Sequence, residues 1–254
     1  MFKQAVCALE VMPVALGAVA SPSPGDSANF YTKEVPGRGV AVFAGRNFLP
    51  GECIFQEAAI FVSAGAASDG GANIRLHEAL AEEERSHRLA PFDIEHHHSA
   101  LCALRDLGPR ACRERLLTKF CGPEDPSQAD SRREAAVLRF AVSRHLLPQA
   151  AAAFSALEYA RLRNVVKFNG FAFHGDLCEG EPGYDIGVAV FDLISRVNHS
   201  CRPNLDFSLS HSETLGIICN SITANREIAM GEELTISYIG GYKLPSEKRR
   251  QKLK

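Results

Sequence analysis

Residues 196–204 read Arg196-Val197-Asn198-His199-Ser200-Cys201-Arg202-Pro203-Asn204 and form the densest polar cluster in the chain. From Asn198 to Asn204 the stretch carries two carboxamides, an imidazole, a hydroxyl and a thiol. Short polar side chains of this kind can hold an irregular loop in place without taking part in any chemistry. Taken alone, the stretch indicates either a tightly bonded loop or a functional site.

Three more specific interpretations of this stretch stay open on the residues alone. His199 and Cys201 are possible metal ligands, but a structural zinc site needs four donors and the sequence has no matching pair elsewhere. The same two side chains could act as a base and a nucleophile, because positions i and i+2 share one face of an extended segment, although no third group is apparent that would orient the imidazole. Asn198-His199-Ser200 is also a glycosylation sequon, which is relevant only to a secreted chain.

The overall composition predicts a folded protein with no dominant charge. The chain has 254 residues, 46% of them hydrophobic, and its 28 Lys and Arg against 30 Asp and Glu leave a formal net charge of -2. That length and apolar content can fill a sizeable core. Because no global field attracts polyanions, we expect no direct nucleic-acid binding. No apolar run reaches the ~18 residues that a spanning helix needs, so we expect no membrane partner.

The cysteines and the N-terminus bear on where the protein works. Eight Cys are scattered along the chain without a C-x-x-C pair, which favours reduced thiols in the nucleus or cytoplasm over a disulfide scaffold. The apolar stretch 11–20 resembles a signal peptide, but Glu10 adjoins it, Pro13 interrupts it and Lys3 is its sole early positive charge. We therefore expect a flexible tail over residues 1–30 rather than a secretion signal.

Strand-like and helix-like sequence alternate along the rest of the chain. Residues 40–62 contain short β-compatible runs around the turn Leu49-Pro50-Gly51-Glu52. From about Asp69 to Lys167 the chain is rich in Ala, Leu, Arg and Glu, and capping boxes predict helix starts at Ser131 and Ser155. Strand-like sequence returns after Lys167. The pattern predicts a β-rich domain split by a helical insertion, with no internal repeat.

Three further groups of residues are assigned to structure rather than to function. His96-His97-His98 resembles a metal-binding tract, but it has no partner ligands, so we expect a solvated loop. Phe168, Phe171 and Phe173 have the spacing of core aromatics along a strand, and we expect them in the core rather than in a channel wall. The basic tail 243–254 is expected to be a solvated terminal helix.

Two separated motifs resemble the hallmarks of the SET-domain protein lysine methyltransferases. The first is Asn198-His199-Ser200-Cys201 followed by Pro203-Asn204, and the second is Gly231-Glu232-Glu233-Leu234-Thr235-Ile236-Ser237-Tyr238. Gly37-Arg38-Gly39-Val40, with Gly51-Glu52 after it, resembles a third element of the family. The three elements stand in the order that the family has.

The helical interruption resembles the branch in which the SET domain is split, as in the SET-and-MYND proteins and their fungal relatives. The resemblance implies an α+β, β-rich SET fold over residues 31–242, with a helical insert at about 69–167 and a C-terminal segment threaded under a loop near the first motif. The chain shows no MYND-like cluster of Cys and His, and it ends at Lys254, where a cysteine-rich post-SET segment would begin. In relatives that have this segment, three of its cysteines and the motif cysteine hold one zinc. We therefore expect no metal at Cys201.

The activity implied by the resemblance is transfer of a methyl group from S-adenosylmethionine to a lysine of a histone or another protein. Tyr238 would be the catalytic residue at the methyl-transfer site. The residues implied in cofactor binding are Gly37, Arg38, Gly39, Asn169, Asn198 and His199. Asn169 is equally typical of a turn before Gly170, and His199 of a packed structural histidine. The alternative is a non-catalytic SET-like module that binds a protein partner, suggested by the missing post-SET segment.

Overall fold

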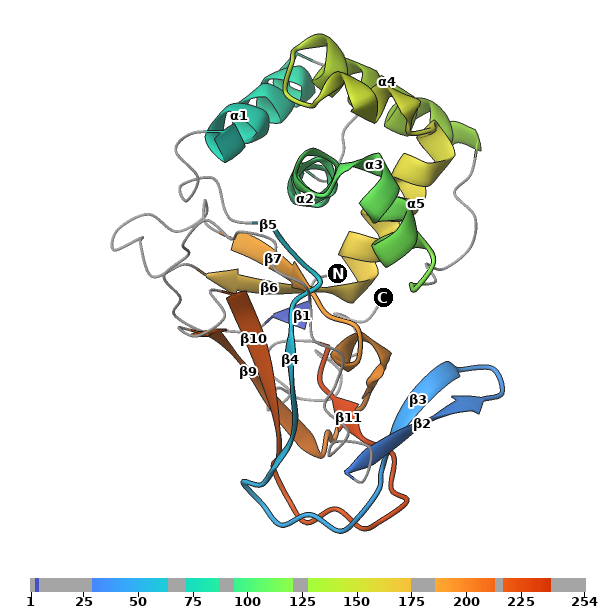
Figure 1. Cartoon of the computed structure of the whole chain (residues 1–254), viewed down its shortest axis with the longest axis vertical. Coiled ribbons are helices and arrows are strands. Elements are labelled where there is room, and N and C mark those ends of the chain that lie inside the picture. Colours follow the sequence, from blue (N-terminus) through green and yellow to red (C-terminus); the bar gives the residue numbers. More distant parts are fainter. Residues whose placement is uncertain are drawn as a thin grey trace.

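The computed structural model describes residues 3–4, 29–63, 72–86, 94–120, 128–174, 186–212 and 217–238. Helices gather at one end of the molecule and strands at the other (Figure 1). The helical part has its own apolar core, and a second core lies among the strands. The architecture is therefore α+β, as the sequence predicts.

The helices lie between β5 (Phe61–Ser63) and β6 (Gly170–His174) in the sequence. They are α1 (Ala72–Arg85), α2 (Ile94–Asp106), α3 (Gly108–Ala111), the π-helical turn η2 (Cys112–Leu117), α4 (Gln128–Ser143), the 3₁₀ turn η3 (Gln149–Ala153) and α5 (Ala156–Asn169). α2 lies in the middle of the group (Figure 1), and its residues 100–104 are fully buried.

The two capping boxes have different outcomes. At Ser155 the prediction is confirmed: its hydroxyl accepts the backbone N–H of Glu158 at 3.2 Å, and the Glu158 carboxylate accepts the backbone N–H of Ser155 at 2.8 Å. The helix start at Ser131 is wrong, because α4 begins at Gln128. Glu134 is fully buried and its Oε1 lies 3.1 Å from Nε of Arg163. The carboxylate that would complete the box thus faces the helical core.

The expectation of a solvated loop at residues 96–98 is also wrong. All three histidines lie in α2 with exposed fractions of 5% or less. His97 Nδ1 lies 2.9 Å from the hydroxyl of Tyr159 on α5. The His97 imidazole tolerates burial because polar groups of neighbouring helices meet it: the Tyr159 hydroxyl and, 3.5 Å from Nδ1, the Glu134 carboxylate. The three-histidine run therefore belongs to a buried helix and not to an exposed loop.

The three phenylalanines after the helices do not share one environment. Phe171 is fully buried, and its ring meets those of Phe191 and Phe207 edge-on at centroid distances of 5.6 and 5.2 Å. Its assignment to the core is confirmed. Phe168 belongs to the last turn of α5 and is 39% exposed, so its assignment to the core is wrong. The side chain of Phe173 lies outside the described part.

In the described ranges the strands pair into small sheets. One has the order β1 (Lys3–Gln4), β6, β7 (Ile186–Val190), β5, and another has β4 (Cys53–Ala58), β10 (Ile217–Ala224), β9 (Leu205–Ser212). β2 (Phe30–Val35) forms a hairpin with β3 (Gly39–Ala44), and β8 (Asn198–His199) pairs with β11 (Thr235–Ile236). β4 precedes the helices and β10 follows them, so their pairing closes the strand part around the insertion.

The N-terminal tail is placed at one point. Lys3 and Gln4 form β1, which runs parallel to Phe171 and Ala172 of β6. The remainder of residues 1–28 lies outside the described residues, as does the basic tail 243–254. Within the stretch 1–30, β1 thus adds a strand beside β6, and the expectation of a flexible tail stays a prediction.

Two turns 180 residues apart have the same backbone design. We call residues 44–54 the first Gly-Glu turn and residues 224–234 the second. Phe48 and Ile228 exchange backbone hydrogen bonds of 2.9 and 3.0 Å. The Gly51 N–H donates to Ala224 O at 2.7 Å, and the Gly231 N–H donates to the carbonyl of residue 44 at 2.8 Å. Identical residues occupy four equivalent positions: Ala44 and Ala224, Arg46 and Arg226, Gly51 and Gly231, and Glu52 and Glu232.

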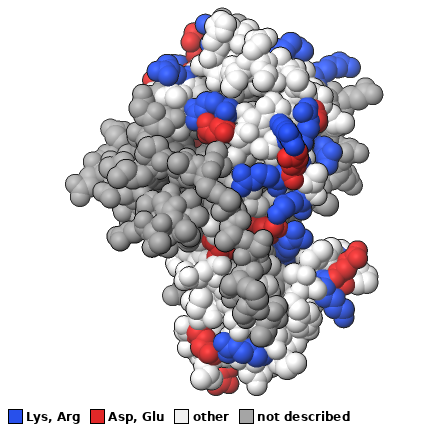
Figure 2. Space-filling view, viewed as in Figure 1, with Lys and Arg blue, Asp and Glu red and all other residues white. Residues whose placement is uncertain are grey.

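The surface carries charges of both signs. On the face shown in Figure 2, Lys and Arg side chains are intermixed with Asp and Glu over the helical part. Ion pairs such as Arg110 with Glu114, at 2.8 Å, join charges of opposite sign on the surface of the helical part. In the described ranges, no helix is long and apolar enough to span a membrane.

Candidate active site

The two hallmark motifs meet as neighbouring strands. β8 and β11 run parallel, with Asn198 beside Thr235 and His199 beside Ile236. The Ser200 N–H extends this contact by donating to Ile236 O at 3.0 Å. The pairing places the C-terminal segment directly against the Asn198 motif, as a threaded arrangement requires.

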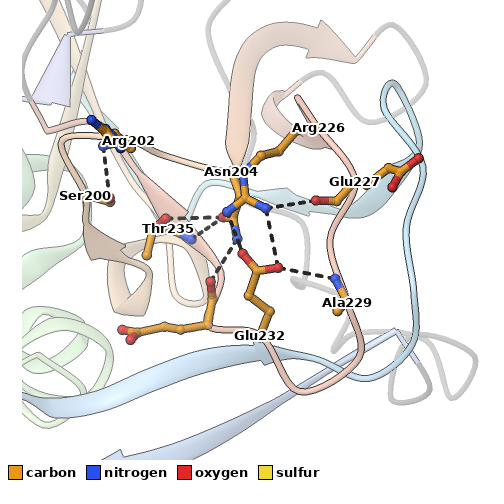
Figure 3. Close-up of polar contacts among 9 residues, drawn as sticks. Ser200, Arg202, Asn204, Arg226, Glu227, Ala229, Glu232 and Thr235 are labelled. Atoms are coloured by element: carbon orange, nitrogen blue, oxygen red, sulfur yellow. Dashed lines mark hydrogen bonds and ion pairs between the residues drawn. The ribbon is translucent and has the colours of Figure 1, made fainter.

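Asn204 locks the two motifs together. Its Nδ2 donates to Glu232 Oε1 at 3.0 Å and to the backbone oxygen of Glu233 at 2.9 Å. Its Oδ1 accepts the Thr235 N–H at 2.8 Å and the Thr235 hydroxyl at 3.2 Å (Figure 3). The residue is 1% exposed. Because every polar atom of this carboxamide is engaged inside the protein, we assign Asn204 a structural role.

Glu232 anchors the second Gly-Glu turn. Arg226 Nη2 donates to its Oε1 at 2.5 Å, and the Ala229 N–H donates to its Oε2 at 3.2 Å (Figure 3). Partial burial alone would raise the pKa of this carboxyl, but the bonds from Arg226 and Asn204 outweigh it and lower the pKa below its usual value. Glu232 therefore stays ionised and holds the turn closed.

Glu233 joins all three sequence elements of the expected site. Its Oε2 accepts Arg38 Nη2 at 2.7 Å, and its Oε1 accepts Asn198 Nδ2 at 2.9 Å. Partial burial would raise its pKa, yet the bonds from Asn198 and Arg38 lower it overall. The sequence prediction missed Glu233 as a site residue, although it stands inside the second motif. The sequence does contain a signal for it: the second motif carries two adjacent carboxylates, and one of them can accept a hydrogen bond from the Asn198 carboxamide of the first motif.

Tyr238 is tied to the first motif at both ends of the residue. Its hydroxyl donates to Val197 O at 2.8 Å, and its backbone N–H donates to His199 Nδ1 at 3.1 Å. Burial raises the pKa of the phenol to about 12. The hydroxyl is therefore neutral at physiological pH and acts as a fixed dipole rather than as a base.

The bond to Tyr238 defines the tautomer of His199. Nδ1 accepts a hydrogen bond, so the neutral ring carries its proton on Nε2. Nε2 lies 3.4 Å from Cys201 Sγ, and the ring therefore donates toward sulfur. This arrangement opposes the base and nucleophile interpretation, in which the imidazole would have to accept the thiol proton. In the part of the chain that the structure describes, no group of three or more His, Cys, Asp or Glu could hold a metal ion.

The Gly37-Arg38-Gly39 turn connects β2 to β3. Gly37 and Gly39 have φ values of +74° and +73°, a left-handed conformation that glycine adopts without strain. No atom lies within 4 Å of a Cβ built on either glycine. Backbone conformation, not crowding, therefore requires glycine at both positions. Arg38, between them, points its guanidinium at Glu233 while half of that side chain stays exposed.

Asn169 lies close to the same region through its backbone. Its carbonyl accepts the Ser195 hydroxyl at 3.3 Å, three residues before Asn198. Its side-chain Nδ2 donates to Val165 O within α5 at 3.0 Å. The structure thus connects Arg38 to Asn198 through Glu233 and brings His199 into direct contact with Tyr238. Asn169 is connected to this region through Ser195.

A family model described as the SET domain matches residues 39–239. The chain belongs to the SET-domain family. The matched range contains both Gly-Glu turns, β8, β11 and the helical insertion, whereas Gly37 and Arg38 lie just before it.

Several curated relatives share segments of this chain. A SET and MYND domain-containing protein of Dictyostelium discoideum is 38% identical over 92 residues, which is 36% of this chain and 16% of that protein. The histone-lysine N-methyltransferase SMYD3 of Homo sapiens is 36% identical over 75 residues (30% and 16%). Smyd1 of Mus musculus, also a histone-lysine N-methyltransferase, is 31% identical over 105 residues (39% and 21%). The matched segments thus span about a fifth or less of these relatives.

Solved structures with a similar fold include two of LSMT. Rubisco LSMT bound to AdoMet superposes with a TM-score of 0.47 at 12% identity, covering 88% of this chain and 50% of that chain. The SET domain of LSMT bound to lysine and AdoHcy gives a TM-score of 0.46 at 11% identity, covering 88% and 51%. This chain spans about half the length of both.

Proposed function

We propose that the protein is an S-adenosylmethionine-dependent protein-lysine N-methyltransferase of the split-SET branch, acting on a histone or another lysine-bearing protein in the nucleus or cytoplasm. The observation that carries the proposal is the bridge from Arg38 through Glu233 to Asn198, which gathers three family elements beside Tyr238. Relatives named as histone-lysine N-methyltransferases support the same class of reaction.

The residues at this site fit the proposed cofactor. S-adenosylmethionine supplies an electrophilic methyl group on a sulfonium sulfur. Arg38 keeps half of its side chain exposed and offers a guanidinium to the carboxylate of the methionine part. The open space at Gly37 and Gly39 leaves the turn's backbone approachable. Asn198 would contribute its carboxamide, and His199 and Asn169 would contribute backbone groups.

Tyr238 would contribute to methyl transfer by positioning the substrate lysine amine. A lysine amine has an ordinary pKa of about 10.4 and must be neutral to attack, and burial in a poorly hydrated channel favours the neutral form. The Tyr238 proton is committed to Val197 O. The lone pairs of its hydroxyl oxygen can then accept an N–H of the amine and orient the nitrogen lone pair. Alignment of this kind, without a general base, is the main source of rate acceleration.

Two substitutions test the proposal. Asn198→Ala is expected to weaken binding of labelled S-adenosylmethionine, and Tyr238→Phe to abolish most methyl transfer to a histone mixture while cofactor binding persists. Tyr31→Phe is the matched control, because Tyr31 lies on β2 with 44% of its surface exposed. If the unsubstituted protein binds no cofactor and transfers no methyl group at high concentration, the proposal is wrong. Binding to a protein partner that survives Tyr238→Phe, with no transfer, would instead support a non-catalytic SET-like module.

A further inference from the structure

A partly buried carboxylate on β4 holds the segment that leads into Asn198. Glu57 Oε2 accepts the backbone N–H of Leu193 at 2.8 Å, and Oε1 accepts that of Ile194 at 2.5 Å. These amides open the 3₁₀ turn η4 (Ile194–Arg196). The first N–H groups of a helical turn have no partner within it, so Glu57 satisfies two donors that the turn itself cannot.

The turn held by Glu57 is connected to the reacting residues. η4 ends at Arg196, the next residue is Val197, and Asn198 follows. The Val197 carbonyl accepts the Tyr238 hydroxyl at 2.8 Å. A shift of η4 would therefore move the acceptor that orients Tyr238 and the carboxamide that meets Glu233.

The environment of Glu57 makes its charge sensitive to pH near neutrality. Burial raises the pKa of this carboxyl to about 7; the bonds from the Leu193 and Ile194 amides oppose the rise, and the nearby Asp192 carboxylate adds to it. Asp192 is itself paired with Lys119 of the helical part at 2.7 Å and with Arg196 at 2.9 Å. Across the sheet, the residue paired with Glu57 is the neutral Asn220.

Asn220 and Glu57 form a cross-strand pair that does not stabilise the fold. Asn220 is fully buried, and in the described structure neither polar atom of its side chain has a hydrogen-bond partner. A buried amide without partners destabilises a fold. Because the pKa of Glu57 is raised from 4.5 to about 7, the fold loses stability as pH rises through that window. Two unfavourable groups side by side are typical of a functional position.

We infer that Glu57 is a positioning residue for the methyltransferase site: its ionised carboxylate fixes η4 and thereby Val197 and Asn198, and protonation releases one of the two amides. The inference rests on the proposed function. A carboxylate offers an acceptor oxygen to each amide, whereas a protonated carboxyl uses one oxygen to carry the proton. Cofactor affinity should therefore follow the ionisation of Glu57.

Glu57→Gln separates this role from a merely structural one. The amide mimics the protonated carboxyl in shape and removes the buried charge. We expect S-adenosylmethionine affinity of the unsubstituted protein to rise about fivefold between pH 6 and pH 8, and affinity of the variant to stay flat at the weaker value. The same variant should unfold at an equal or higher temperature at pH 8, because it lacks a charge that is partly removed from water. Weaker binding together with equal or greater stability is an outcome that a structural residue would not give.

Glu114→Gln is the matched control, since Glu114 is an exposed carboxylate in η2, within the helical part. It should keep the pH profile of the unsubstituted protein. The inference is overturned if Glu57→Gln retains that profile, or if it lowers both stability and affinity together.

A cofactor-free measurement distinguishes failure of the inference from failure of the proposed function. The amide ¹H–¹⁵N signals of Leu193, Ile194 and Asn198 should titrate with a midpoint near pH 7 in the unsubstituted protein, as the carboxyl does, and should not titrate in Glu57→Gln. If no cofactor binds but these signals titrate as expected, the proposed function fails while the positioning of the segment holds. If cofactor binds and the signals do not move, Glu57 has no positioning role.

Discussion

The two Gly-Glu turns have the same backbone design and different tasks. In the first, Glu52 accepts the Leu49 N–H and is paired with Arg46. In the second, Glu232 accepts the Ala229 N–H and is paired with Arg226. Each arginine also donates to the backbone carbonyl of the residue after it. The glutamate, glycine and arginine shared by the two copies thus serve to close a turn.

The likeness extends to an asparagine at the base of each preceding hairpin. The backbone oxygen of Asn29 accepts the Gly45 N–H at 2.7 Å, and that of Asn204 accepts the Asn225 N–H at 3.0 Å. Asn29 Nδ2 reaches Ile54 O at 3.2 Å, as Asn204 Nδ2 reaches a carbonyl of the second turn. Both asparagines tie the start of a hairpin to the far side of its turn.

The copies differ at the residue after the shared glutamate. Cys53 in the first turn is exposed, whereas Glu233 in the second accepts bonds from Arg38 and Asn198. The repeated positions therefore build the fold, and a single unrepeated carboxylate connects one copy to the candidate active site. Substitutions at equivalent positions can separate these two roles.

The largest effect is expected from removing the shared glutamate of the second turn. Glu232→Ala deprives Arg226, Asn204 and the Ala229 amide of their acceptor and should lower the free energy of unfolding by about 2 kcal/mol. Glu52→Ala should cost less, because the first turn has no equivalent of the bond from Asn204. Urea unfolding measures both, and equal losses would contradict the proposed difference between the copies.

Glu233→Gln should affect binding more than stability. A glutamine loses the charged pair with Arg38 and can present an NH₂ group to the Asn198 NH₂ group, so we expect about tenfold weaker S-adenosylmethionine binding. Stability should change by no more than about 0.5 kcal/mol, as is usual for partly exposed positions. Cys53→Ser at the equivalent position is the control and should change neither quantity. Calorimetric titration and thermal unfolding would show the separation.

Substitution of Gly51 and Gly231 tests whether the two turns have equivalent backbone conformations. Gly51 and Gly231 have φ values of +86° and +82°, and nothing lies within 4 Å of an added Cβ at either. Alanine should therefore cost about 1 kcal/mol at each, from backbone conformation alone. Asparagine, which tolerates this conformation better, should cost less at both. Unequal losses in chemical denaturation would show that the backbone equivalence is only approximate.

The smallest expected effect is on thermal stability at acid pH. The pKa of Glu232 lies below its ordinary value of 4.5, so its pairing stabilises the fold above that pH and is lost as pH falls through the lowered value. Glu232→Gln should therefore flatten the decline of thermal stability below about pH 4.5. Glu114→Gln, on the exposed helical surface, should leave the decline as steep as in the unsubstituted protein. A decline that stays steep in Glu232→Gln would assign the acid sensitivity to other carboxyls.

Sequence motifs sufficed to predict the α+β SET fold and the meeting of Arg38, Asn198 and Tyr238. They did not reveal Glu233, because two adjacent glutamates look alike until the backbone direction is known. In an extended segment successive side chains point to opposite sides, so Glu232 faces Asn204 and Glu233 faces Asn198. The motif located the site, and the opposite directions of the two side chains decided which carboxylate belongs to it.

Other features depend on contacts between distant segments and leave little trace in the sequence. The two Gly-Glu turns share only four identical residues, too few to identify their likeness from the sequence. The likeness becomes visible in the structure, where Phe48 and Ile228 exchange backbone hydrogen bonds. Glu57 reads as one polar residue in a β strand until η4 is placed against it. His96–His98 look exposed because charge and polarity predict the surface, whereas packing of α2 on every side overrides that preference.

The contact between the two turns also constrains how the protein folds. Met230 donates its N–H to Asn47 Oδ1 across 183 residues of chain. The entropy lost in closing such a loop grows only with the logarithm of its length, about 0.6 kcal/mol for each doubling. The length of chain between the two turns therefore adds little to the free-energy cost of bringing them together, but long-range pairing slows folding. Helices made of local contacts should form first, and the candidate active site, assembled from three distant segments, should form last.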